Sequence, residues 1–133
     1  MMEILLVEDN EILAKGIIYS LEQEKFKVIH KTNAKETIKF LQNEKPKLVI
    51  LDISLPDGNG FNLYEKNIKD KNIPTIFLTA KDDEDDIVKG LEVGAEDYIT
   101  KPFSIRELIA RINKILLRNK KNSIIKVKDI EFD

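Results

Sequence analysis

The 133-residue sequence contains no cysteine and a single histidine, His30. Without cysteine there can be no thiolate nucleophile, iron–sulfur cluster or cysteine-bound zinc, and one imidazole cannot form a histidine metal cluster. The five glycines and four prolines are too few for collagen or a low-complexity chain. Stability must therefore come from packing, and a chain of this length can bury roughly two-thirds of its surface, enough for an apolar core.

Net charge and long apolar runs are lacking as well. The 22 basic and 24 acidic residues leave a formal charge of −2, so the chain as a whole does not present the positive surface that binds nucleic acid. The apolar run at residues 4–7 is too short for a signal peptide or a membrane helix. We therefore expect a cytoplasmic protein that would contact DNA only through another domain.

What the sequence does contain is a regular alternation of two kinds of segment. Continuous apolar runs rich in β-branched residues predict strands buried on both faces, and the segments between them have the apolar spacing of helices. The strands are predicted at residues 4–7, 26–29, 48–51, 76–78 and 98–99. The helices are predicted at residues 12–21, 38–41, 61–71, 87–91 and 105–116. This alternation predicts an α/β fold, a doubly wound parallel sheet with helices on both faces.

The end of the chain breaks this alternation. A polar stretch at residues 118–122 precedes a segment in which apolar and charged residues alternate, the pattern of a short strand. We therefore predict one domain over residues 1–119, followed at 120–133 by a linker and the opening strands of a truncated second domain. The alternative is an edge strand or a frayed terminus of the first domain.

Polar side chains stand where the predicted strands end. Glu8 and Asp9 follow the first strand, Asp52 ends the third, Thr79 closes the fourth and Lys101 follows the fifth. In a doubly wound sheet these ends meet at one edge, so we expect the side chains to share a pocket. Clustered carboxylates repel one another unless a cation neutralises them, and a small open acidic site suits Mg²⁺ better than Ca²⁺.

Asp52 is the candidate for the chemistry of this pocket. A lone carboxylate directly after an apolar strand costs free energy unless it is paired or bound to a metal. Such a carboxylate can accept a phosphoryl group while a metal and an ammonium group, here Lys101, neutralise the developing charge. Taken singly, Asp9 is better interpreted as a helix N-cap or a solvated turn residue. Lys101 alone could equally be a solvent-facing loop charge, and Thr79 a hydrogen-bonded hydroxyl at a strand end. Only the combination favours a phosphoryl acceptor.

Four segments of the sequence resemble the receiver domain of bacterial two-component response regulators. They are LLVEDN at 5–10, LVILDISLPDGNG at 48–60, FLTA at 77–80 and GAEDYITKPFSIREL at 94–108. The resemblance implies a flavodoxin-like, five-stranded sheet of order 2-1-3-4-5 with five helices. It also implies a phosphorylation-activated switch rather than an enzyme, with at most self-phosphorylation from small phosphodonors and slow autodephosphorylation.

The resemblance also assigns roles to residues at the strand ends. Asp52 would accept the phosphoryl group from the histidine of a sensor histidine kinase, with Mg²⁺ as cofactor. The ligands of Mg²⁺ would be Asp52, Glu8, Asp9 and the main-chain carbonyl of Ser54. On activation, Thr79 would move to the phosphoryl group, Lys101 would pair with it, and Tyr98 would turn inward.

The stretch at residues 90–112 resembles more specifically the OmpR/PhoB subfamily, transcription regulators that pair a receiver with a winged-helix DNA-binding domain. That resemblance implies a homodimer, formed on phosphorylation through the fourth helix, the fifth strand and the fifth helix. The implied ion pairs join Asp97 to Arg111 and Glu96 to Arg118 across the dimer. DNA would be bound only by the domain missing from this chain.

One position departs from the subfamily pattern. Ile87 stands where a Lys usually meets the acid equivalent to Glu107, so the interface would lose one ion pair. Exposed pairs are individually worth little, so dimerisation is compatible with this loss.

Three other functions compete with this interpretation. A Mg²⁺-dependent phosphatase of the haloacid-dehalogenase kind would need a second Asp two residues after the nucleophile, but Ile53 and Ser54 follow Asp52. A stand-alone receiver would dock on another protein without a DNA-binding domain, and only the tail and the subfamily motif disfavour it. A degenerate, unphosphorylated receiver is disfavoured because all the site positions hold the expected residue types.

Overall fold

The structure is a computed structural model that describes residues 2–80 and 97–132, with side chains described as far as Arg118. The chain divides into two compact units, Met1–Phe103 and Ser104–Asp133. No helix in the described stretches is both long enough and apolar enough to cross a membrane.

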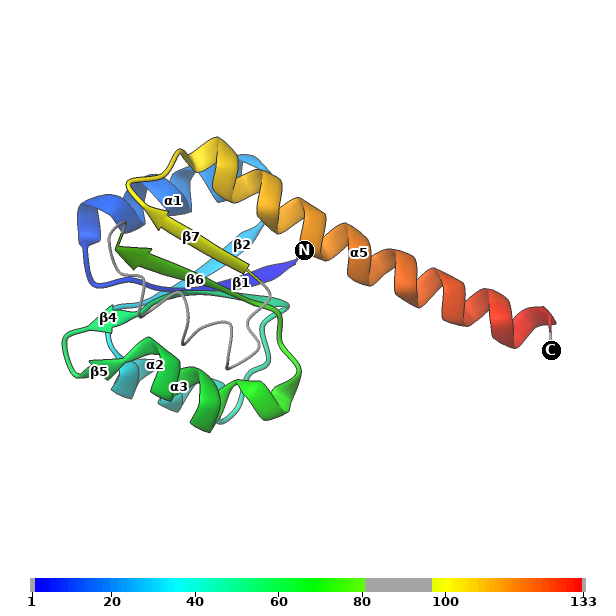
Figure 1. Ribbon diagram of the computed structural model, residues 1–133, viewed down its shortest axis with the longest axis horizontal. Coiled ribbons are helices and arrows are strands. Elements are labelled where there is room, and N and C mark those ends of the chain that lie inside the picture. Colours follow the sequence, from blue (N-terminus) through cyan, green and yellow to red (C-terminus); the bar gives the residue numbers. More distant parts are fainter. Residues whose placement is uncertain (1, 81–96, 133) are drawn as a thin grey trace. The chain divides into compact units, whose positions relative to one another are not determined.

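A five-stranded parallel sheet forms the centre of the first unit (Figure 1). Its strands are β1 (Glu3–Val7), β2 (Lys27–Lys31), β3 (Leu48–Asp52), β6 (Thr75–Ala80) and β7 (Asp97–Lys101). They lie in the order β2-β1-β3-β6-β7, and each neighbouring pair is parallel. When only the five strands of this sheet are numbered along the chain, their order is 2-1-3-4-5. The predicted doubly wound fold is therefore confirmed.

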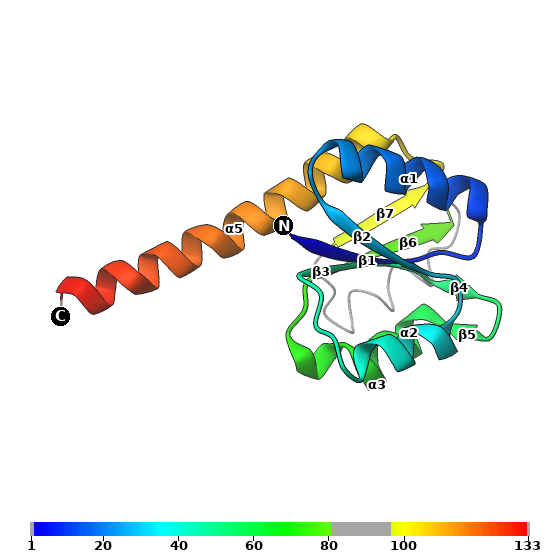
Figure 2. The same ribbon diagram turned by 180° about the vertical axis from the view of Figure 1, so that it is seen from behind.

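Helices cover both faces of this sheet. Helix α1 (Glu11–Gln23) lies on one face, and α2 (Ala34–Leu41) and α3 (Gly60–Asn67) lie on the other (Figures 1 and 2). A short 3₁₀ helix, η1 (Lys69–Lys71), follows α3 where the sequence predicts one continuous helix. The helix predicted at residues 87–91 lies outside the described residues.

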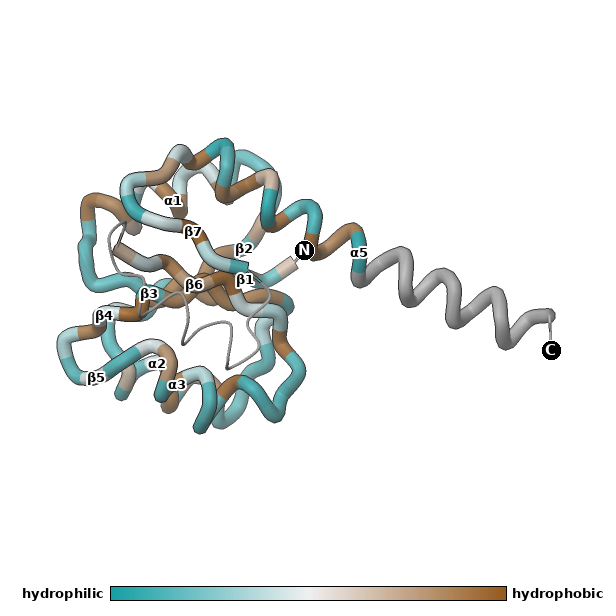
Figure 3. Tube along the Cα trace, viewed as in Figure 1, coloured by the Kyte–Doolittle hydropathy of each residue, from teal (hydrophilic) through white to brown (hydrophobic). Residues whose placement is uncertain are grey.

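The three central strands, β1, β3 and β6, are mostly apolar because both of their faces are covered. Every residue of β3 is buried, as are the last four residues of β1. On one face, Phe77 of β6 meets Phe61 of α3 edge to face, with ring centroids 4.7 Å apart. Figure 3 shows the same arrangement, with hydrophobic strands in the middle of the unit. Each fully buried side chain of this kind contributes about 1.5–3 kcal/mol, so the core fixes where the strand ends lie.

A two-stranded hairpin connects β3 to α3. Its strands are β4 (Ser54–Leu55) and β5 (Gly58–Asn59), which pair antiparallel. The tight turn between them agrees with the Pro and Gly residues that surround Asp57 in the sequence. The hairpin therefore starts two residues after Asp52, at the edge where the strands end.

The second unit consists of helix α5 (Ile105–Phe132). The Ser104 hydroxyl caps its start by accepting a hydrogen bond from the Glu107 amide at 3.0 Å. The backbone stays helical through residues 120–132, where the sequence predicts a linker and short strands. A strand needs a neighbouring strand to bond its backbone groups, whereas a helix bonds them within its own segment. The assignment of residues 120–133 to a further domain stays a prediction.

Candidate functional site

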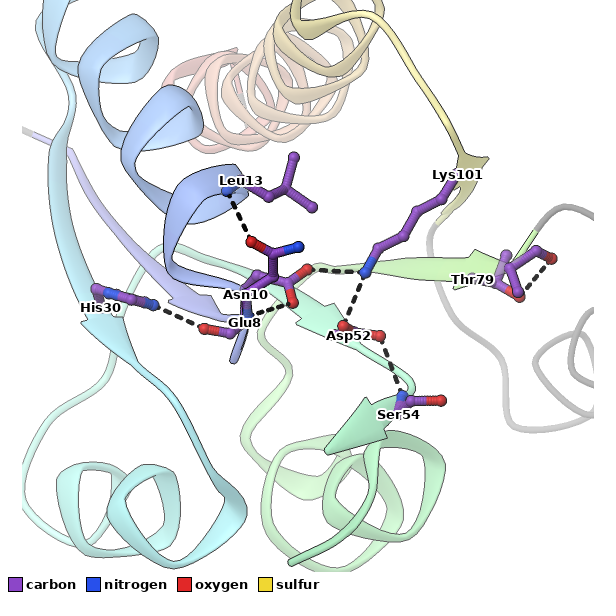
Figure 4. A network of polar contacts seen from close by, with 9 residues as sticks. Glu8, Asn10, Leu13, His30, Asp52, Ser54, Thr79 and Lys101 are labelled. Carbon is purple, nitrogen blue, oxygen red and sulfur yellow. Dashed lines mark hydrogen bonds and ion pairs between the residues drawn. The ribbon is translucent and has the colours of Figure 1, made fainter. Parts of the chain in front are cut away.

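Three strands bring their polar end residues together at one edge of the sheet. Glu8 follows β1, Asp52 ends β3 and Lys101 ends β7. The Lys101 ammonium nitrogen Nζ lies 2.9 Å from Asp52 Oδ2 and 3.0 Å from Glu8 Oε1 (Figure 4). Residues far apart in the sequence thus form one compact charged group, as the sequence predicts.

Asp9 adds a third carboxylate to this group. One oxygen from each of Glu8, Asp9 and Asp52 lies within 4.8 Å of the others. Glu8 is completely buried and Asp52 is 5% exposed, whereas Asp9 is exposed to solvent. The helix cap that the sequence allows for Asp9 is made by its neighbour, because Asn10 accepts the hydrogen bond from the Leu13 amide at 3.1 Å. Asp9 is therefore not committed to capping α1.

Three carboxyl groups outnumber the single ammonium group, that of Lys101, with which the described residues of the site pair. Burial, together with the nearby Asp52 carboxyl, raises the pKa of Glu8 to about 7, although the Asn10 amide and Lys101 oppose this. Burial lowers the pKa of Lys101, but its hydrogen bonds with Asp52 and Glu8 outweigh burial and raise the pKa above its usual value. Lys101 is therefore a fixed positive charge. Oxygen donors with a surplus of negative charge are the set that Mg²⁺ prefers, so these residues fit that ion.

The hairpin supplies the other contact of Asp52. The Ser54 amide donates a hydrogen bond to Asp52 Oδ1 at 3.0 Å, while Oδ2 faces Lys101. The carboxylate is therefore oriented from both sides. Ser54, whose carbonyl the resemblance assigns to the metal, lies directly beside the acid cluster.

Thr79 lies at the same sheet edge, but no hydrogen bond joins its hydroxyl to Asp52 or Lys101 in the described part of the chain. It is buried, its hydroxyl donates to the Ala80 carbonyl at 3.4 Å, and Figure 4 shows it apart from the carboxylate group. The expected approach of Thr79 to a phosphoryl group would therefore require movement.

Tyr98 already lies against the core in this structure. Its ring stacks on Phe77, with centroids 6.2 Å apart, and its buried hydroxyl has no hydrogen-bond partner among the described residues. Burial, and secondarily the charge of Asp97, raises the pKa of Tyr98. An unpartnered buried hydroxyl costs free energy, which is consistent with a side chain that changes position.

The residues assigned to a dimer interface are only partly described. Ile87 and Glu96 lie outside the described residues. Glu107 pairs with Arg111 one turn along the same helix, with 3.3 Å between the charged atoms. The carboxylate of Asp97 accepts a hydrogen bond from the Tyr98 amide at 2.8 Å. Arg118 is exposed on α5.

Sequence reasoning missed two contacts next to the site. The sequence marks His30 only as the single histidine, but its Nε2 hydrogen-bonds the Glu8 carbonyl at 2.8 Å and so supports the chain where β1 ends. Asp57, which lies in a Pro-Asp-Gly sequence typical of turns, accepts hydrogen bonds from the start of α2. The one sequence signal for the contact of His30 is its position near the end of a strand. No local sequence pattern indicates the contact of Asp57 with α2.

The protein is a doubly wound α/β domain in which three carboxyl groups and Lys101 meet at the carboxyl edge of the sheet. Residues 4–113 match the response regulator receiver domain family, and the chain belongs to this family. It is therefore a regulatory domain of two-component signal transduction.

Individual relatives agree with this assignment. The alkaline phosphatase synthesis transcriptional regulatory protein PhoP of Bacillus subtilis is 42% identical over 88% of this chain and 49% of its own length. The response regulator SaeR of Staphylococcus aureus is 39% identical over all of this chain and 58% of its own length. The chain thus spans about half the length of these curated relatives. Among solved structures, the non-phosphorylated HemR receiver domain from Leptospira biflexa superposes with a TM-score of 0.79 at 38% identity, covering 86% of this chain and 94% of that one.

Proposed function

We propose that this domain is a phosphorylation switch in which Asp52 accepts a phosphoryl group from a sensor histidine kinase in the presence of Mg²⁺. The observation that carries the proposal is the convergence of Glu8, Asp9 and Asp52 around Lys101. A site of this composition is costly to a folded protein unless a ligand balances its charge.

The proposed reaction transfers a phosphoryl group from the histidine of the kinase to the carboxylate of Asp52. An Asp52 carboxylate oxygen attacks the phosphorus of the kinase phosphohistidine, the new P–O bond forms, and the P–N bond breaks with its electron pair returning to the imidazole. Lys101 stays protonated throughout and stabilises the charge on the phosphoryl oxygens, while the Ser54 amide holds the carboxylate in orientation. Bound Mg²⁺ would be held by Glu8, Asp9, Asp52 and the Ser54 carbonyl and would supply further positive charge to those oxygens.

A cavity of about 430 Å³ is lined in part by Lys101, which pairs with Asp52 and Glu8. We propose that the phosphoryl donor enters on this side. The walls of the cavity are formed by Asn10, Leu13, Ala80, Lys101, Pro102 and Phe103. The kinase histidine would approach from this side, in the cytoplasm where sensor kinases present their catalytic portions.

The experiment for this proposal is phosphorylation without a kinase. We expect a small acyl phosphate to add one phosphoryl group to the purified chain in the presence of Mg²⁺, read by intact mass. Chelation of Mg²⁺ should abolish the addition, because Lys101 alone leaves the carboxylate cluster negative and repels the incoming phosphoryl oxygens. Equal phosphorylation with and without the metal would contradict a metal-assisted switch.

We further propose that phosphorylation promotes a homodimer through the fourth helix, the fifth strand and the fifth helix, with Asp97, Arg111, Glu96 and Arg118 in cross-dimer ion pairs. Thr79, which is buried, and Tyr98, whose hydroxyl is buried, would transmit the change, because they lie on the neighbouring strands β6 and β7. The dimer would control transcription through a winged-helix DNA-binding domain outside this chain, as the lengths of the relatives suggest.

Dimerisation can be measured with a phosphoryl mimic. We expect beryllofluoride with Mg²⁺ to shift the wild-type chain from monomer to dimer in sedimentation velocity, because the mimic occupies the acceptor site and holds the switched state. The Asp52→Asn variant is the control and should remain monomeric. Unchanged sedimentation of the saturated wild type would contradict phosphorylation-gated dimerisation by this chain.

A further inference from the structure

The β4–β5 hairpin, residues 54–59, is fastened to a helix far away in the sequence. The Asp57 carboxylate accepts hydrogen bonds from the amides of Ala34, at 2.7 Å, and Lys35, at 3.0 Å, which are 23 and 22 residues distant. These amides belong to the first turn of α2 and have no partner within the helix. The two hydrogen bonds hold the pKa of the Asp57 carboxyl below its usual range.

Asp57 is not needed as the ordinary cap of α2. Asn33 already holds the cap position, and its side chain accepts from the Glu36 amide at 2.8 Å. Asp57 instead accepts hydrogen bonds from two other amides, to which the Asn33 side chain is not hydrogen-bonded. The positive end of the helix dipole also stabilises a carboxylate at this position. The contact therefore joins the tip of the hairpin to the start of α2.

The other end of the hairpin is fixed as well. Asn59 accepts a hydrogen bond from the Phe61 amide at 2.7 Å and caps α3, and the Gly60 amide donates to the Ile53 carbonyl at 2.7 Å. Within the hairpin, Ser54 pairs with Asn59. Asp57 holds the turn, so the hairpin is held at its base and at its tip.

We propose that Asp57 is a positioning residue of the phosphorylation site, which holds the hairpin so that the Ser54 amide and carbonyl stay beside Asp52. The expected effect on phosphorylation rests on the proposed function, whereas the hydrogen bonds that hold the hairpin do not depend on it. A hairpin with strands of two residues has little stability of its own. The two hydrogen bonds that Asp57 accepts at its tip therefore limit how far Ser54 can move. A shift of about 1 Å in a positioning group can lower a rate by about 100-fold.

The test compares Asp57→Ala with a matched control, Asp70→Ala, which removes another exposed aspartate. We expect Asp57→Ala to lower Mg²⁺ affinity by about 10-fold, the usual cost of losing a residue that supports a ligand, and to slow phosphorylation by acyl phosphate. Asp70→Ala should leave both unchanged. Asp57→Asn keeps one acceptor oxygen and should restore part of the loss, and it serves as the working variant if Asp57→Ala does not fold.

A second readout separates this inference from the proposed function. Hydrogen exchange of the Ser54 amide, measured by NMR without metal, should be faster in Asp57→Ala and Asp57→Asn than in the wild type. If exchange, Mg²⁺ affinity and phosphorylation all match the wild type while thermal stability falls, Asp57 is a helix cap only and the inference is overturned. If the wild type itself neither binds Mg²⁺ nor becomes phosphorylated, the proposed function fails, and the exchange rates still decide whether Asp57 positions Ser54.

Discussion

Replacement of Asp52 by Asn is expected to abolish phosphorylation while leaving the fold intact. The amide is not a nucleophile, but its oxygen can still accept the hydrogen bond that the Ser54 amide gives to Asp52 Oδ1. The substitution also removes one negative charge beside Glu8, whose pKa the Asp52 carboxyl helps to raise. Relief of that repulsion should offset the loss of the ion pair with Lys101, which keeps Glu8 as a partner, so the melting temperature of Asp52→Asn should equal or exceed that of the wild type.

Asp9→Asn is the matched control for this prediction. Asp9 belongs to the same carboxylate cluster but is exposed, and it has no role as nucleophile in the proposed chemistry. Its loss should weaken Mg²⁺ binding, so a higher Mg²⁺ concentration should restore phosphorylation of Asp9→Asn but not of Asp52→Asn. Intact mass across a Mg²⁺ titration measures both variants. Phosphoryl incorporation into Asp52→Asn would show that another residue accepts the group.

Gly60→Ala is expected to be the most disruptive small substitution near the site. A methyl group at Gly60 would lie 2.5 Å from the Asp52 carbonyl oxygen and 2.9 Å from Ile53 Cα. Both of these are backbone atoms, so the end of β3 or the start of α3 must move. Forced movement of this kind typically costs about 1–3 kcal/mol, the range that we expect in the free energy of unfolding. The same movement displaces Asp52, so phosphorylation should slow as well.

The neighbouring glycine offers a control with the same chemical change. A methyl group at Gly58 would meet only the side-chain Cβ of Ala34, at 3.7 Å, which is ordinary van der Waals contact. Gly58→Ala should therefore change the free energy of unfolding by less than about 0.5 kcal/mol. Urea unfolding of both variants measures the difference. Equal stabilities would contradict the close approach of Gly60 to the backbone of Asp52.

The sheet and the position of its site could be predicted from sequence because the signals are local. The apolar run that ends at Asp52 is continuous, which indicates a strand covered on both faces, and the residue that follows such a run must lie at the sheet edge. The meeting of Glu8, Asp52 and Lys101 then follows from topology alone. Their distances confirm that prediction.

Contacts between distant parts of the chain could not be predicted in the same way. The hydrogen bonds from Ala34 and Lys35 to Asp57 depend on how the hairpin and α2 pack, and aspartates are common in turns that contact no distant helix. The distance of Thr79 from the carboxylates depends on a side-chain orientation that no spacing determines. The alternation at residues 120–133 predicts strands, but a strand forms only beside a partner strand, and the backbone of residues 120–132 is helical.

The central claim is that Asp52 is the acceptor of a phosphoryl group. The most direct test is mass-spectrometric location of that group on the wild-type chain after incubation with a small acyl phosphate and Mg²⁺, with rapid digestion at low temperature. We expect one phosphoryl group, on the peptide that contains Asp52 and assigned to that residue by fragmentation. A phosphoryl group on any other residue, or none in the presence of Mg²⁺, would contradict the claim.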